Sequence, residues 1–135
     1  MFSWLVLCVL LAAPAQACGS RHKLVGAPED VSPDDPELQK AVHFAVTEYN
    51  EASNDVFASK VVRILSAEQQ IVAGVKYTFE VELGRTQCKQ GQVHDLETCN
   101  FSETPHKTFC KFEVLSIAWR GETSLQSKMC KPSSN

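Results

Sequence analysis

Hydrophobic and polar positions alternate between residues 75 and 83, which is the period of a β-strand with one buried face. The apolar members of this run are Val75, Tyr77, Phe79, Val81 and Leu83. Upstream, a β-branched run over residues 61–65 fades into the polar residues 66–70, which predicts a strand that leaves the core before the chain turns. The two strands therefore form a hairpin that turns at residues 70–74.

The turn of this hairpin contains two large aliphatic side chains. It consists of Gln70, Ile71, Val72, Ala73 and Gly74. Turns usually carry polar residues because loops lie in water. Ile71 and Val72 therefore have two interpretations: they continue a strand into the core, or they form an exposed wedge that is buried against another protein. Periodicity alone does not choose between them.

Apolar residues at spacings of three and four predict one long amphipathic helix. Its stripe consists of Leu38, Ala41, Val42, Ala45, Val46, Tyr49 and Ala52. We expect Asp35 to be the N-cap because Pro36 suits the first helical position; a capping box between Ser32 and Asp35 is the alternative. Residues 53–55 end the helix, and the stripe is long enough to face a sheet.

Two further strands are predicted at residues 108–117 and 123–129. Residues 118–121 connect them and contain Trp119. A tryptophan at a hairpin turn contributes little to a core. Either its ring folds back over the sheet edge, or it is an anchor for an interface, where tryptophan is enriched.

The first 18 residues, with a boundary uncertain by two, have the layout of a secretory signal peptide. Residues 1–17 carry no charged side chain, and a short apolar run is followed by Ala15-Gln16-Ala17. This run is too short to span a bilayer. We therefore expect a secreted protein whose residues 19–135 form a single domain.

Six cysteines are present, of which Cys8 leaves with the signal peptide and Cys18 lies at the cleavage boundary. The remaining four are Cys88, Cys99, Cys110 and Cys130. In a secreted chain they predict two disulfides, and of the three possible connectivities the sequential one closes the shortest loops. A zinc site is the rival interpretation, but no pair has Cys-x-x-Cys spacing.

The net charge of −3 and the scattered basic residues indicate neither nucleic acid nor an anionic membrane as a partner. We expect a protein partner and no cofactor or metal.

A long polar segment, residues 87–107, contains Asn100-Phe101-Ser102, which matches the acceptor pattern for N-glycosylation. So short a pattern also arises by chance, and the use of Asn100 stays open.

Taken together, these segments resemble the cystatins, which inhibit papain-like cysteine proteases. Residues 70–74 match the Gln-x-Val-x-Gly loop of that family. Gly26, after two aliphatic residues, is similar to the family's N-terminal glycine, and Trp119 to the tryptophan of its second hairpin. The last four cysteines follow the two-disulfide layout of secreted, type 2 cystatins. Ala118 departs from the pattern because the family usually has proline there.

This resemblance implies an α+β fold in which an antiparallel sheet of about five strands wraps around one long helix. The segment before Asp34 would supply the fifth strand. It also implies that Gly26, residues 70–74, Ala118 and Trp119 meet at one end and enter a protease cleft, with Leu24 and Val25 reaching the unprimed subsites. Inhibition would be reversible and competitive, with no bond to the catalytic cysteine, and the inhibitor would be a monomer.

Ser53, Asn54 and Asp55 resemble the loop with which some secreted cystatins inhibit legumain, a protease that cleaves after asparagine. Asn54 would occupy the specificity pocket of legumain. The alternative is an ordinary turn at the end of a helix, for which asparagine and aspartate are equally suited.

Two rival functions remain. A cystatin-fold binding module without inhibitory activity, similar to fetuin-like and cathelicidin-like domains, is the first; such relatives generally lack the first-hairpin loop that this chain has. The second is a secreted hydrolase, whose catalytic set would have to come from the four histidines, His22, His43, His94 and His106. No Ser, His and acid motif accompanies them, so we expect no enzyme.

Overall fold

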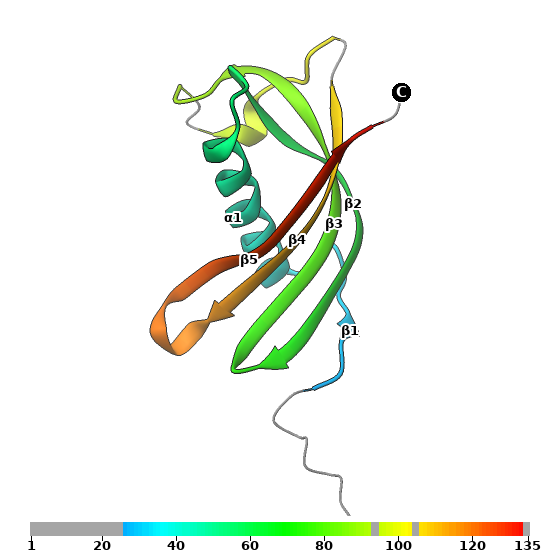
Figure 1. The fold of residues 1–135 in the computed structure, drawn as a ribbon, viewed down its shortest axis with the longest axis vertical. Coiled ribbons are helices and arrows are strands. Elements are labelled where there is room, and N and C mark those ends of the chain that lie inside the picture. Colours follow the sequence, from blue (N-terminus) through cyan, green and yellow to red (C-terminus); the bar gives the residue numbers. More distant parts are fainter. Residues whose placement is uncertain (1–25, 93–94, 104–105, 134–135) are drawn as a thin grey trace, which may run out of the picture.

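The computed structural model describes residues 26–92, 95–103 and 106–133. The predicted signal peptide, Cys18, Leu24 and Val25 lie outside these residues. One helix, α1 (Pro36–Ala52), packs against a curved antiparallel sheet (Figure 1). The strands are β1 (Glu29–Asp30), β2 (Phe57–Val72), β3 (Gly74–Lys89), β4 (Lys107–Ile117) and β5 (Glu122–Pro132).

The strands lie in the sheet in the order in which they follow one another in the chain, β1-β2-β3-β4-β5. Two long hairpins, β2–β3 and β4–β5, therefore lie side by side and project their turns toward the same end of the molecule (Figure 1). This arrangement confirms the predicted α+β fold. The short strand β1 comes from the segment before Asp34, as expected, and β5 extends beyond the predicted residues 123–129 at both ends.

Helix α1 begins where the sequence predicts. Asp35 is its N-cap, and the Oδ2 atom of Asp35 accepts a hydrogen bond from the backbone N–H of Leu38 at 3.0 Å. The first five residues of the predicted stripe, from Leu38 to Val46, are buried against the inner face of the sheet, where Phe79 and Phe112 are the largest fully buried side chains. Of the last two, Tyr49 is half-buried and Ala52 is exposed, because the end of the helix extends past the core. Burial of this stripe, rather than intrinsic helix propensity, stabilises the helix.

Strand β2 is longer than the run that predicted it: it begins at Phe57 and pairs with β3 along its whole length, up to Val72 opposite Gly74. Ala67 is buried, whereas residues 68–72 lie outside the core, as expected for a strand that leaves the core before the chain turns. Three register shifts, between residues 57 and 59, 61 and 63, and 64 and 66, interrupt the alternation of inward and outward side chains. Because each such irregularity changes which residues face the core, the period of two is lost from the sequence of this strand.

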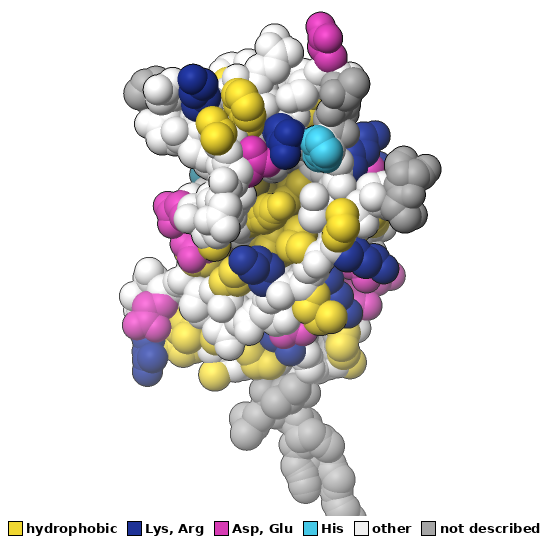
Figure 2. All heavy atoms as spheres, turned by 45° about the horizontal axis from the view of Figure 1, so that its top comes forward, with side chains coloured by type: hydrophobic (Ala, Val, Ile, Leu, Met, Phe, Trp, Pro, Cys, Tyr) yellow, Lys and Arg dark blue, Asp and Glu magenta, His cyan; other side chains and the backbone are white. Residues whose placement is uncertain are grey.

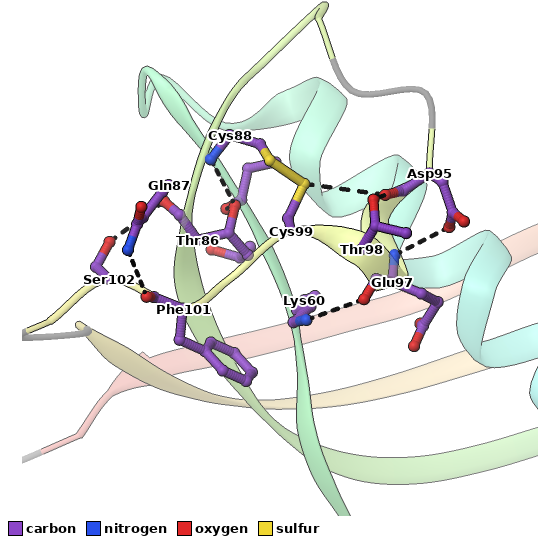
Figure 3. The surroundings of a disulfide bond; sticks show 12 residues. Lys60, Thr86, Gln87, Cys88, Asp95, Glu97, Thr98, Cys99, Phe101 and Ser102 are labelled. Carbon is purple, nitrogen blue, oxygen red and sulfur yellow. Dashed lines mark hydrogen bonds between the residues drawn. A yellow bond between two sulfur atoms is a disulfide. The ribbon is translucent and has the colours of Figure 1, made fainter.

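The two disulfides pair the cysteines sequentially, which confirms the predicted connectivity. Cys110 on β4 is joined to Cys130, its direct neighbour on β5, and Cys88 is joined to Cys99. The second of these fastens the segment after β3 to the end of that strand (Figure 3). There the hydroxyl of Thr86 accepts a hydrogen bond from the Cys88 N–H, and the side chain of Gln87 donates to the Phe101 carbonyl.

Within the described residues, α1 is too short and too polar to cross a membrane, and no other helix qualifies.

Candidate functional site

The turn of the first hairpin lies at Ala73, between the paired residues Val72 and Gly74. Gly74 has a φ of +126°, a backbone conformation that residues with a Cβ rarely adopt, so glycine is required at this position. Ile71 is 52 % exposed and Val72 is half-buried, and neither joins the core. The two residues continue β2 but lie at its exposed tip, so they do not extend into the core.

Gly26 lies directly beside this tip. Its backbone N–H donates a hydrogen bond to the carbonyl of Ile71 at 2.9 Å, and the side-chain amide of Gln70 donates to the Gly26 carbonyl, also at 2.9 Å. A Cβ on Gly26 would lie 3.7 Å from the Cβ of Ile71. The N-terminal segment is thus joined to the first hairpin through the side chain of Gln70 and the backbone of Ile71.

The turn of the second hairpin is a short 3-10 helix, η3 (Ala118–Arg120), that ends at Gly121. Gly121 has a φ of +64° and donates its backbone N–H to the carbonyl of Ala118 at 3.0 Å. Trp119 is 71 % exposed and does not join the core. Its ring therefore does not fold back over the sheet, and a large apolar surface faces solvent at this turn.

The two hairpin tips touch one another. A Cβ on Gly74 would lie only 2.7 Å from the carbonyl oxygen of Ser116 and 3.1 Å from the side chain of Ile117. We call Gly26, residues 70–74, Ala118 and Trp119 the apolar wedge. Although its parts lie far apart in the sequence, all of them reach the same end of the molecule (Figure 1).

The loop that follows α1, residues 53–56, lies at the opposite end of the molecule (Figure 1). We call it the helix-end loop. Asn54 is exposed at this loop, whereas its neighbours Ser53 and Asp55 are half-buried. The Ser53 hydroxyl accepts a hydrogen bond from the Asp55 N–H at 3.0 Å, and the Asp55 carboxylate accepts one from the Phe57 N–H at 3.0 Å. These bonds fix the backbone on both sides of Asn54.

Arg85, on β3, adds a charged contact to the helix-end loop. Its Nε and Nη2 atoms lie 2.9 and 2.7 Å from the same carboxylate oxygen of Asp55. Arg85 and Asp55 also line a hollow of about 690 Å³ together with Tyr49 and His106. In Figure 2, where this end is tilted toward the reader, apolar side chains lie in a hollow that basic, acidic and histidine side chains surround.

One titratable group near the apolar wedge has a perturbed pKa. Burial raises the pKa of the Tyr77 hydroxyl above its ordinary value, and the nearby carboxylates of Asp35 and Glu37 raise it further. Tyr77 therefore stays neutral at physiological pH. No group of three or more His, Cys, Asp or Glu residues among those described here is placed to hold a metal ion.

Comparison with known proteins identifies the family. The family model described as Cystatin domain matches residues 26–119, which is more than half of the chain. This chain belongs to the cystatin family. Cystatin of Coturnix japonica is 46 % identical over 114 residues, covering 82 % of this chain and 97 % of the relative. Cystatin-C of Homo sapiens is 40 % identical over 132 residues, covering 93 % of this chain and 90 % of the relative.

Solved cystatin structures have the same architecture. The crystal structure of dimeric human cystatin F superimposes with a TM-score of 0.77 at 33 % identity, covering 90 % of this chain and 98 % of that one. The crystal structure of Al-CPI gives a TM-score of 0.70 at 26 % identity, covering 80 % and 100 %. Cystatins are inhibitors of cysteine proteases and not enzymes, which rejects the secreted-hydrolase interpretation.

Sequence reasoning found the exposed residues of both ends but missed the side chains that hold the helix-end loop. Asn50 clamps the end of α1 to β2: its side-chain amide donates to the Ser59 carbonyl and accepts from the Ser59 N–H, both at 2.9 Å. Gln90 donates its backbone N–H to the Val56 carbonyl at 2.8 Å. Arg85, Asn50 and Gln90 carried no signal in the sequence because the fold determines their partners: Arg85 and Asp55 are 30 positions apart, and even Asn50 and Ser59, 9 apart, lie on different elements.

Proposed function

We propose that this cystatin is a reversible, competitive inhibitor of papain-like cysteine proteases and that the apolar wedge is its binding surface. Ile71, Val72 and Trp119 fill the primed side of the protease cleft, while the segment before Gly26 reaches the unprimed side. Inhibition arises from burial of apolar surface that is already ordered, so little conformational entropy is lost on binding. No bond forms with the catalytic cysteine.

The observation that carries this proposal is the meeting of three distant segments at one exposed apolar end. Ile71 and Trp119, at 52 % and 71 % exposure, are costly to expose to water unless they are buried in a complex. Gly26 is hydrogen-bonded to Ile71, and Gly74 fits against Ser116 with no room for a side chain. These contacts fix the geometry of the wedge before any protease arrives.

Titration of papain with the purified protein tests the proposal. We expect a dose-dependent loss of activity that dilution restores and that high substrate concentration relieves. Papain whose catalytic cysteine carries a small methylthio group should still bind, since the contact is not covalent. If no inhibition occurs at micromolar concentration, the chain is a cystatin-fold binding module without inhibitory activity.

We further propose a second site, in which the helix-end loop inhibits legumain and Asn54 enters its asparagine-specific pocket. The proposal is supported by the exposure of Asn54, which leaves its side chain accessible, and by the hydrogen bonds that fix Ser53 and Asp55 on either side of it. Because the backbone of this loop is already fixed, little conformational entropy is lost when it enters a protease cleft. Because the two sites lie at opposite ends, one inhibitor molecule should bind papain and legumain at the same time, which analytical ultracentrifugation can detect.

We also propose that the protein is secreted as a monomer. The leader at residues 1–18 and the two disulfides support secretion, since disulfides persist in oxidising compartments. Secretion from transfected cells and sedimentation of the product test these points. The secreted product also shows whether Asn100, which is exposed, is glycosylated. A loss of mass on treatment with an N-glycan-removing amidase would establish that it is.

A further inference from the structure

The helix-end loop is fixed from three directions. From the helix side, the Ser53 N–H donates to the Asn50 carbonyl at 3.2 Å. From the turn directly after β3, the Gln90 N–H donates to the Val56 carbonyl at 2.8 Å, and the Gln90 side chain donates to the Asn50 carbonyl at 3.1 Å. The third contact is the ion pair between Arg85 and Asp55, which includes one hydrogen bond from Nε of Arg85 and is the only one of the three made by a charged side chain.

Arg85 itself is held firmly. It lies in β3 opposite Ser59 of β2, its backbone N–H donates to the His106 carbonyl, and its own carbonyl accepts from the Ser102 N–H. The guanidinium therefore projects from a strand that is hydrogen-bonded on both sides. A rigid strand of this kind is a better platform for positioning a neighbouring loop than another loop would be.

We propose that Arg85 is a positioning residue for the helix-end loop: its guanidinium holds the Asp55 carboxylate so that the loop presents Asn54 in one fixed conformation. This inference rests on the second site proposed above. Asp55 directly follows Asn54, and its other carboxylate oxygen accepts the Phe57 N–H. One carboxylate thus connects the residue beside Asn54 both to the start of β2 and to β3.

The charge on Arg85 alone would not achieve this. The Nε atom of Arg85 donates a hydrogen bond to one oxygen of Asp55 at 2.9 Å, and Nη2 lies 2.7 Å from the same oxygen. Two adjacent nitrogens of a rigid guanidinium therefore restrict the position of the carboxylate. Lysine provides a single charged group and lacks the planar fork of arginine. Substitution by lysine should therefore restore only part of the function.

The test compares Arg85→Met and Arg85→Lys with the unaltered protein against legumain and papain, using fluorogenic peptide substrates. For legumain we expect the inhibition constant to rise about tenfold with Arg85→Met and less with Arg85→Lys, since a mobile loop must be ordered on binding. Papain inhibition and the melting temperature should change little. The Arg85→Met protein should also be cleaved faster after Asn54, because flexible loops are preferred sites of proteolysis.

Arg63→Met is the matched control. Arg63 also pairs with a carboxylate on the same sheet, lying 3.0 Å from Glu82, but it does not touch the helix-end loop. Its removal should leave legumain inhibition within about twofold of the unaltered protein. An amide-exchange measurement adds a readout without protease: the Phe57 N–H should exchange faster in Arg85→Met and not in Arg63→Met.

The outcomes separate the two proposals. If the unaltered protein does not inhibit legumain, the second site is wrong and this inference falls with it. If the unaltered protein inhibits and Arg85→Met inhibits equally well, the second site stands and the role of Arg85 is wrong. Loss of legumain and papain inhibition together would also overturn the inference, because it would mean that Arg85 stabilises the whole fold.

Discussion

The two ends of this cystatin are built from opposite kinds of contact. At the apolar wedge, three segments distant in the sequence meet mainly through backbone atoms, as in the bond from Gly26 to Ile71 and the close approach of Gly74 to Ser116. At the helix-end loop, one continuous segment is held mainly by polar side chains, including the ion pair of Asp55 with Arg85. The first end exposes hydrophobic groups and the second exposes an amide.

This difference has a consequence for binding. An apolar surface gains free energy from almost any shape-complementary groove, so affinity at the wedge should depend on how much of its surface is buried. A single polar group gains binding free energy only where a pocket supplies matching hydrogen-bond partners. The helix-end loop should therefore be more selective among proteases than the wedge is. The predictions below change one end at a time, from the largest expected effect to the smallest.

The largest effect should follow Asn54→Lys. A long cation cannot replace an amide in a pocket built for asparagine, so legumain inhibition should fall by about 100-fold or more. Papain inhibition should not change, because the residue lies at the far end. Inhibition constants for both proteases measured on one preparation provide the check. An equal loss against both, or against neither, would reject two separate sites.

Trp119→Ala should weaken papain binding by about 2 kcal/mol or more, which corresponds to roughly 30-fold in the dissociation constant. The ring is 71 % exposed and has no role in the core, so the melting temperature should stay nearly constant. Titration calorimetry with papain measures the affinity of the apolar wedge, and titration with legumain measures that of the helix-end loop. Unchanged papain affinity would mean that Trp119 lies outside the interface.

Gly74→Ala should weaken papain inhibition about tenfold by straining the first hairpin. The new Cβ would lie 2.7 Å from the Ser116 carbonyl at a φ of +126°, and such strain costs about 1–3 kcal/mol. Gly91→Ala is the control, since Gly91 also has a positive φ, +81°, but nothing lies within 4 Å of its added Cβ. If both variants weaken papain inhibition equally, contact between the hairpins is not the cause.

Ala118→Pro should give the smallest change and a gain. Ala118 opens the 3-10 turn, where proline is pre-organised, and Ile117 before it is extended, with φ −114° and ψ 91°. Restricting the backbone of this turn in the free inhibitor should contribute about 0.4–1 kcal/mol to binding, which is roughly two- to fivefold in papain affinity. Weaker binding would show that alanine fits this turn better than proline does.

The fold could be predicted from the sequence wherever the periodicity was regular. The stripe on α1 and the alternation in β3 are unbroken, and Asp35 caps the helix as its position before Pro36 predicts. The start of β2 at Phe57 was not predicted, because three register shifts break the alternation along this strand. An irregularity of this kind depends on the partner strand, so a single sequence does not reveal it.

The candidate site could be predicted only in part. Exposed hydrophobic residues at turns, such as Ile71 and Trp119, are visible in a sequence because they conflict with the usual chemistry of loops. The contacts that order them are not visible, since Gln70 reaches Gly26 across 44 positions in the chain and Arg85 reaches Asp55 across 30. Pairing over such separations is a property of the fold and not of local composition.

Hydrogen exchange of the chain bound to papain is the most direct test of the central claim, that three distant segments form one preformed binding surface. On binding, we expect slower amide exchange at Gly26, at residues 71–74 and at residues 118–120 together, with no change at residues 53–56. Protection confined to one hairpin, or protection of the helix-end loop instead, would contradict the account.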